Sequence, residues 1–597
     1  MSPTLILAAS LLQPTGLPPI THGVPAAPIA MEAPFDVQVS VNVANGDVLS
    51  GVVQFRVTVR ADHAITQVEF YVGNDLRETD SSTPYVFTFD TLNEDDGEVT
   101  LAFAAYTSEG GRGRKEVTVK IDNGVSKGAE HHIERALEFL TESKWDEALL
   151  AGRLALRADA QSVRARLVMA RANLGKGVYD LAQKFAEDGL ALDPGNRELQ
   201  LLLSSVNVRR ALSILDRPGS DRMDTIRQIG QSLQAAARQR TELRIAEFEA
   251  VGPVTNENRL RYADAAIRAG RYSAAIAALQ NQLATTSDVA NVANRLIYAQ
   301  IRAGRYTDAV SAMRLYKQRR GVDAYGYALD AVLQFMQGNR EASTEALKEA
   351  QLSDQEDLGV RLAQAWLALA ENNTARLRPI ATGLAREQDQ LPQVNYYLAT
   401  LNRILNEFTQ SRKYFQEAII VDPAFEDMYI ERGNESFKIV MGAGLEERDR
   451  EYELAVAREF FQTALAVKED SAQALTGMAL VAMGQNKSVS DMVSFARAAA
   501  VAGPQYAPAH YTLSGALTIA ARAQRAAADN HAKEGRAQEA RELNALAAQS
   551  ERDAIAAMQL AGQLDRANLQ GRIAPTVVQA WNYFYQYGRN LVITAPR

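Results

Sequence analysis

The chain has 597 residues, which is too long for one compact core and predicts at least two folded units. Its 64 basic and 72 acidic residues give a net charge of −8 without a long run of one sign, so no nucleic-acid surface is indicated. Cysteine is absent, which excludes disulfides, thiolate nucleophiles and cysteine-ligated zinc.

The first segment, residues 1–34, does not resemble a folded domain. Leu5–Leu12 is an apolar run of signal-peptide length, too short to cross a bilayer. The first basic residue is Arg56, so either residues that precede Met1 are missing or the run is not a signal. Prolines between Pro14 and Pro34 indicate an extended linker. We predict a candidate signal peptide with a linker and a periplasmic or extracellular location, while a cytoplasmic location stays open.

The next segment, residues 35–122, alternates apolar and polar residues over short runs. This period of two predicts antiparallel strands, and glycine-containing turns such as Asp96-Gly97 separate them. About seven strands in so short a segment predict a β-sandwich. The alternating apolar positions are Val37, Val39, Val41, Val43, Phe55, Val57, Val59, Tyr85, Phe87, Phe89, Val99, Leu101, Phe103, Ala105, Val117, Val119 and Ile121.

Three stretches of this segment, Val68–Val72, Pro84–Asp90 and Ala105-Tyr106, resemble the bacterial immunoglobulin-like domains of envelope and secreted proteins. The resemblance implies an immunoglobulin-like β-sandwich that acts as a spacer or an adhesion unit. It keeps open a contact with glycans through this domain.

Residues 123–127 form a predicted hinge, and helical periodicity begins at residue 128. One phrase occurs three times, as Ala269–Ala275, Ala303–Ala309 and, more loosely, Gln337–Ser343. The glycines within it are 34 residues apart (304 − 270 and 338 − 304). A fixed period of this length indicates stacked helical hairpins, and glycine after the first helix fits a left-handed C-terminal cap.

The phrase and its period resemble the tetratricopeptide repeat family, which implies an α-α superhelical solenoid that binds protein segments in its groove. In that family the inward positions of each first helix contact the ligand. They correspond to Asp264, Arg268, Asn294, Tyr298 and Arg302, our candidate protein-binding groove. The alternative is an unoccupied hydrophilic face. The Lys/Asn clamp of chaperone-binding members is not present, so chaperone partners are not implied.

We predict partly degenerate repeats over residues 128–506, with an insertion near 441–450. Residues 507–565 are rich in alanine, glutamine and arginine and predict a long helical hairpin that turns near Glu534-Gly535. Residues 566–597 form an aromatic C-terminal cap or tail. They could cap the last hairpin, form an exposed docking peptide, or belong to a further β-rich region.

Motifs for enzyme chemistry are not found in the sequence, so we predict no catalytic residue, cofactor or metal. The adjacent His131 and His132 point apart on a helix and are expected at its surface. The acidic loop 93–97 could hold calcium, but a hairpin turn explains it as well. We therefore predict a non-enzymatic interaction scaffold of the cell envelope without a transmembrane helix. The alternative is a surface adhesion or glycan-binding protein.

Overall fold

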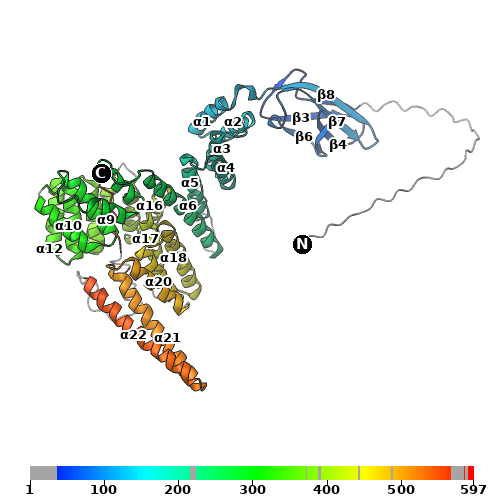
Figure 1. The fold of residues 1–597 in the computed structure, drawn as a ribbon. Helices are drawn as coiled ribbons and strands as arrows, with labels where there is room; N and C mark the ends of the chain where they lie inside the picture. Colours follow the sequence, from blue (N-terminus) through cyan, green and yellow to red (C-terminus); the bar gives the residue numbers. More distant parts are fainter. Residues whose placement is uncertain are drawn as a thin grey trace, which may run out of the picture. The chain divides into compact units, whose positions relative to one another are not determined.

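The computed structural model describes residues 37–215, 223–319, 321–371, 373–387, 391–441, 444–485, 488–565, 584 and 589–596. The candidate signal peptide and most of the aromatic C-terminal stretch, Trp581 included, therefore lie outside the described residues. The chain divides into two units, Met1–Ser126 and Lys127–Arg597. The first is all-β and the second all-α (Figure 1), which confirms the predicted fold class.

The β unit is a sandwich of two sheets. A three-stranded sheet has the order β1-β3-β6, and a five-stranded sheet has the order β2-β8-β7-β4-β5. Neighbouring strands are antiparallel except β2 and β8, which are parallel. The strands are β1 Gln38–Val41, β2 Val48–Leu49, β3 Val52–Arg60, β4 Ile65–Val72, β5 Asp75–Asp80, β6 Tyr85–Asp90, β7 Gly97–Thr107 and β8 Arg112–Ile121.

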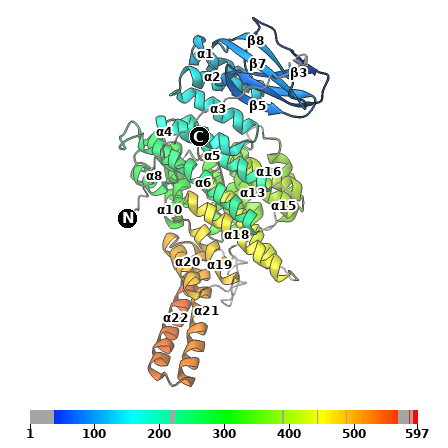
Figure 2. The same cartoon turned by 90° about the vertical axis from the view of Figure 1, so that its right-hand side faces the viewer.

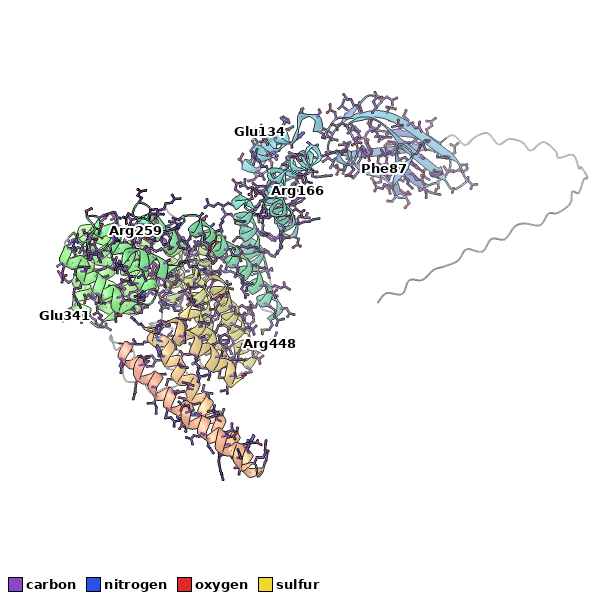
Figure 3. All side chains as sticks on the ribbon, viewed as in Figure 1. Phe87, Glu134, Arg166, Arg259, Glu341 and Arg448 are labelled. Atoms are coloured by element: carbon purple, nitrogen blue, oxygen red, sulfur yellow. The ribbon has the colours of Figure 1, made fainter. Side chains whose placement is uncertain are left out.

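The alternating residues of these strands build the core of the sandwich. Phe70 is 1% exposed, and its ring centroid lies 5.5 Å from that of Phe55 and 5.1 Å from that of Phe103. Figure 3 shows Phe87 among the strands of this unit. Because successive side chains of a strand point to opposite faces, the period of two brings these rings together between the sheets.

The acidic loop before β7 is a turn whose carboxylates are engaged by the protein. Asp96 accepts the backbone N–H of Asn123 at 2.9 Å and that of Val125 at 3.2 Å. Glu94 pairs with Arg77 at 2.7 Å. These contacts support the interpretation as a turn rather than as a calcium site.

The helical unit consists of antiparallel hairpins in which consecutive helices pack against each other. Its helices are α1 Ala129–Thr141, α2 Trp145–Ala158, α3 Val163–Gly175, α4 Tyr179–Leu192, α5 Arg197–Leu215, α6 Met223–Glu249, α7 Arg259–Arg268, α8 Tyr272–Leu279, α9 Val289–Arg302, α10 Tyr306–Arg319, α11 Ala324–Met336, α12 Arg340–Ser353, α13 Leu358–Ala370, α14 Thr374–Leu384, α15 Pro392–Ile404, α16 Phe408–Val421, α17 Glu426–Val440, α18 Glu447–Val467, α19 Ala472–Gly484, α20 Val489–Ala502, α21 Ala507–Lys533 and α22 Ala537–Leu564.

The repeated phrase forms the turn within a hairpin. Gly270 and Gly304 have φ of 69° and 70°, which confirms the predicted left-handed caps. Asn406 takes φ 62° between α15 and α16, as asparagine also tolerates this conformation. Further on, Ala275 and Ala309 are fully buried where the two helices of a hairpin meet. The small side chain allows the close approach that the repeat requires.

The solenoid closes on itself. Helix α6 packs along α18, although a whole series of hairpins separates them in the sequence. Gly230 of α6 lies so close to Glu459 of α18 that an added Cβ would clash with its Oε2 atom. Arg244 of α6 pairs with Asp422 at 2.6 Å. We call α5 to α18 the ring, since the packing of α6 on α18 closes it.

Helices α1 to α4 precede the ring in the chain, and α19 to α22 follow it. Figures 1 and 2 both show α21 and α22 side by side as a long hairpin, and Gly535 lies in its turn with φ 80°. Charged side chains such as Glu341 and Arg448 are exposed on the outer surface of the helical unit (Figure 3). Among the helices that the structure describes, none is both long enough and apolar enough to cross a membrane.

Candidate functional site

The interior of the ring holds a segment of the chain itself, residues 589–596, which we call the C-terminal segment. It has no helix or strand, and it contacts residues of α9, α11, α17 and α19. It therefore crosses the space that the sequence predicts to be a groove for a protein partner.

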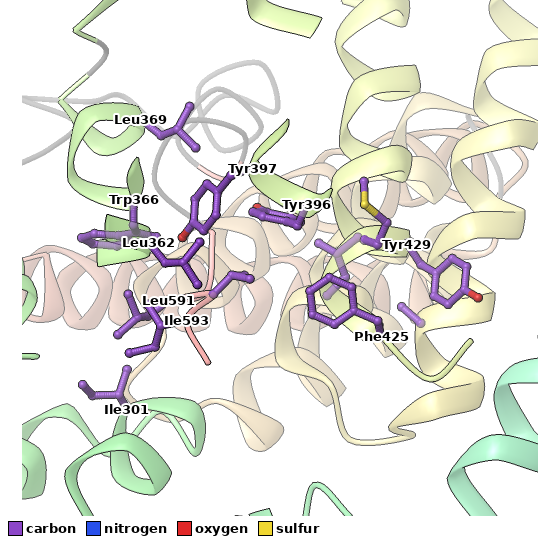
Figure 4. Close-up of a cluster of buried hydrophobic side chains, with 14 of the residues drawn as sticks. Ile301, Leu362, Trp366, Leu369, Tyr396, Tyr397, Phe425, Tyr429, Leu591 and Ile593 are labelled. Carbon is purple, nitrogen blue, oxygen red and sulfur yellow. The ribbon is translucent and has the colours of Figure 1, made fainter. Parts of the chain in front are cut away.

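Three aliphatic residues anchor the segment. Leu591, Val592 and Ile593 are 3%, 2% and 1% exposed and belong to the core of the helical unit. Figure 4 shows Leu591 and Ile593 in a cluster with Ile301 of α9 and Trp366 of α13. Burial of each such side chain contributes about 1.5–3 kcal/mol relative to exposure in water.

A buried ion pair fixes the start of the segment. Arg589 donates from Nε and Nη2 to the two carboxylate oxygens of Glu431 on α17, both at 3.0 Å. Their side chains are 8% and 3% exposed. The hydroxyl of Tyr396 donates to Glu431 Oε2 at 3.3 Å. Burial raises the pKa of Tyr396 well above its ordinary value, so this hydroxyl remains a neutral donor.

A second buried ion pair lies one helical turn away. Arg302 of α9 donates to both oxygens of Asp427, at 3.1 and 2.9 Å, and their side chains are 8% and 6% exposed. Burial acts to lower the pKa of Arg302, but the charge of Asp427 raises it above the ordinary value. The same carboxylate accepts the side-chain amide of Asn590 at 3.0 Å. Gln473 of α19 donates to the amide oxygen of Asn590.

The backbone of the segment is held as well. Arg302 Nη1 donates to the carbonyl oxygen of Leu591 at 3.3 Å. The hydroxyl of Tyr325 donates to the carbonyl oxygen of Thr594 at 2.8 Å. Burial raises the pKa of Tyr325 well above its ordinary value and keeps the hydroxyl protonated. These two contacts do not depend on the side chains of the bound segment.

The structure places the five candidate groove residues in different environments. Asp264 pairs with Arg295 at 2.7 Å, and Asn294 donates to Asp323 at 3.0 and 2.8 Å, so both connect neighbouring hairpins. Tyr298 is buried. Arg302 touches the C-terminal segment, whereas Arg268 is exposed on the wall of a cleft. Whether these residues bind a partner stays a prediction.

The cleft beside the C-terminal segment has a volume of about 1360 Å³. Its walls come from α6, the α7–α8 turn, α18 and the segment itself, at Val592 and Ile593. Both signs of charge line it: Arg238, Arg268 and Arg271 with Glu242, Glu469 and Asp470. The ring is therefore not filled by the segment, and space remains next to it.

Sequence reasoning missed the residues that hold the segment. Asp427 and Glu431 lie on α17, outside the clear repeats, and four residues apart they share one helix face. Three consecutive aliphatic residues, Leu591–Ile593, are a sequence signal for burial. The prediction for residues 566–597 rested on their aromatic side chains instead. Of that stretch, Phe584 is 1% exposed and its ring lies 6.3 Å from that of Phe461.

One expectation about the histidines is wrong. His132 is 2% exposed rather than at the surface, because it faces the first hairpin, in which Ile133 and Ala136 are also buried. Among the described residues, no group of three or more histidine, cysteine, aspartate or glutamate side chains could hold a metal ion.

Comparison with known proteins identifies the β unit. Residues 38–102 match the family model described as a bacterial Ig domain. The predicted bacterial immunoglobulin-like domain is confirmed. A search of curated proteins found no match. Among solved structures, the fibronectin(III)-like modules of Clostridium thermocellum CbhA are 23% identical, with 14% of this chain and 94% of theirs covered and a TM-score of 0.13.

Other solved structures also match part of the chain. The Cut9-Hcn1 hetero-tetramer structure of the APC/C matches with 13% identity, 73% of this chain, 95% of that chain and a TM-score of 0.33. The structure of Pseudomonas aeruginosa pilF matches with 16% identity, 40% and 99% coverage and a TM-score of 0.18. The hairpins, their 34-residue period and their glycine caps confirm the predicted α-α superhelical solenoid.

Proposed function

We propose that this protein is a non-enzymatic protein–protein interaction scaffold of the cell envelope, which binds a segment of a partner protein inside the ring. The C-terminal segment is the observation that carries the proposal. It supports the proposal because the interior holds a non-helical stretch of the chain, with buried apolar positions for Leu591, Val592 and Ile593, which we call the apolar seat, and with donors for the backbone. Groups of this kind recognise peptides in other binding sites.

The envelope location is supported by the bacterial Ig domain at residues 38–102. The alternative is adhesion or glycan binding through the β unit. Its described phenylalanines lie mainly in the core, as at Phe55, Phe87 and Phe103, and cannot stack on a sugar. We do not propose that alternative.

The test requires a ring whose own segment is displaced. We define the opened variant as the full chain with Leu591→Asp and Ile593→Asp, because two carboxylates cannot enter the apolar seat without a large desolvation cost. The probe is a fluorescein-labelled peptide with the sequence of residues 589–596. We expect it to raise its fluorescence anisotropy on binding to the opened variant and to bind the unaltered chain at least tenfold more weakly.

The control is the same pair of substitutions at exposed sites, Leu546→Asp with Ile555→Asp on α22, where the side chains are 54% and 59% exposed. This control should bind the peptide no better than the unaltered chain does. If a folded opened variant binds no peptide at all, the proposed function is wrong.

A further inference from the structure

The charges in the ring restrict which segment fits there. Asp427 and Glu431 present two carboxylates to the interior from one face of α17. Asp427 receives its cation, Arg302, from the ring itself. Within the described part of the chain, Glu431 forms its ion pair with Arg589, and Arg589 belongs to the C-terminal segment. A ring without that segment leaves Glu431 with the hydroxyl of Tyr396 as its hydrogen-bond donor.

A buried carboxylate without a cation is strongly destabilising, whereas a paired one is tolerated. An occupant that replaces the C-terminal segment therefore has to supply a positive charge to Glu431. Arginine suits this place better than lysine, because the two parallel contacts to Oε1 and Oε2 match the planar guanidinium.

The contacts that follow fix the remaining positions. The residue after the arginine meets Asp427 and Gln473, which together offer an acceptor and a donor to an amide side chain. The next three residues enter the apolar seat with at most 3% exposure. Beyond them, Tyr325 meets a backbone carbonyl and sets no requirement on the side chain.

We propose that the partner of this ring is a non-helical protein segment with the pattern arginine, small polar residue, and then three aliphatic residues, and that it competes with residues 589–593 for the same seat. The proposal rests on the proposed function. It adds the chemistry of the partner segment and states which residue of the ring each of its positions contacts.

The experiment compares labelled peptides on the opened variant. The parent peptide has the sequence of residues 589–596, and two others carry Arg589→Ala or Arg589→Glu. We expect the Arg589→Ala peptide to bind at least tenfold more weakly than the parent and the Arg589→Glu peptide to show no binding at the same concentrations. In the opened variant with Glu431→Gln, the difference between the parent and the Arg589→Ala peptide should fall below threefold.

The outcomes separate the two proposals. Equal binding of the three peptides overturns the partner pattern but leaves the proposed function intact, as does a discrimination that survives Glu431→Gln. Absence of all binding to a folded opened variant overturns both. If the opened variant does not fold, the full chain with Arg589→Ala replaces it, which frees Glu431 while the apolar residues remain. If the full chain with both Arg589→Ala and Glu431→Gln, which leaves no unpaired carboxylate at this position, also fails to fold, the segment is a fixed part of the core and the proposal is wrong.

Discussion

The interior of the β-sandwich and the interior of the ring contain different kinds of contact. The sandwich is filled by phenylalanine rings, and its described ion pairs, such as Arg114–Glu116, lie at the surface. Within the described part of the chain, the ring and the C-terminal segment form two ion pairs in which every side chain is below 10% exposed, Arg302–Asp427 and Arg589–Glu431. A buried ion pair seldom stabilises more than apolar residues of the same volume. The proposed partner pattern assigns the charges in the ring a role in selecting the bound segment, a role that the core of the sandwich does not have.

The largest effect is expected when the buried ion pair Arg302–Asp427 is broken. Arg302→Ala leaves Asp427 without its cation and is expected to lower the free energy of unfolding of the helical unit by about 3–5 kcal/mol. Urea unfolding followed by far-ultraviolet circular dichroism measures the change, because helices dominate that signal. The matched control is Arg305→Ala, which removes an exposed pair with Asp308 and should cost at most about 1 kcal/mol. Equal effects would contradict the distinction between the two pairs.

The corresponding test in the sandwich is Phe70→Ala. It removes a ring that contacts Phe55, Phe87 and Phe103 and should cost about 3–4 kcal/mol in the β unit. Differential scanning calorimetry of the full chain is expected to show a lower melting temperature for one transition and an unchanged helical transition. Val52→Ala, at a site 59% exposed, is the control and should shift neither. A shift of both transitions by Phe70→Ala would show that the two units do not unfold independently.

A third prediction concerns close packing in the helical unit. An added Cβ at Gly477 would meet the ring of Phe461 at 2.5 Å, so Gly477→Ala should destabilise by about 1–2 kcal/mol although alanine favours helices. Gly515→Ala is the control with the opposite sign, because no atom of the described residues outside its own stretch of helix lies within 4 Å of its added Cβ. We expect it to stabilise by about 0.5–1 kcal/mol in the same urea experiment. Stabilisation by both variants would refute the packing argument.

The smallest expected effect is a dependence on pH. Burial lowers the pKa of His510 on α21, although the carbonyl of Pro504 at 3.1 Å acts in the opposite direction. The folded state thus binds the proton less readily than the unfolded state, whose pKa is about 6.5. Its contribution to stability is complete above that pH and is lost as the pH falls from there towards the lower folded pKa.

The measurement is the difference in urea stability between the unaltered chain and His510→Gln across this window. The difference is needed because burial raises the pKa of Glu426 and Glu435, so their protonation on acidification acts in the opposite direction. We expect the acid-induced loss to be smaller in His510→Gln. An identical loss in both chains would show that His510 does not contribute.

The local parts of the fold could be predicted from the sequence. Period two predicted the sandwich and period 34 the hairpins, because each follows from contacts between residues close in sequence. Strand β5 gave no such signal, since Asp75–Asp80 is an edge strand with almost entirely exposed residues. The closing contact between Gly230 and Glu459 also gave none, because no local pattern records which distant surfaces meet.

The candidate site was predicted only in part, for a related reason. Repeat register selected Arg302 as a groove residue, and in the structure it donates to the backbone of the C-terminal segment, while its contact with a partner stays a prediction. The same register could not tell that Asp264 and Asn294 pair with the neighbouring hairpin. The register also could not identify Glu431 as a site residue. The role of Glu431 depends on its contact with Arg589, which is 158 positions further along the chain.

The closure of the ring also has a consequence for the order of events during synthesis. Gly230 of α6 emerges from the ribosome 229 residues (459 − 230) before its neighbour Glu459 of α18. At the usual rate of translation this delay is roughly 10–45 s. During that time the face of α6 that will meet α18 has no partner within the nascent chain. An open solenoid can stabilise each hairpin on the one before it, but this ring is complete only when both ends of the closure exist.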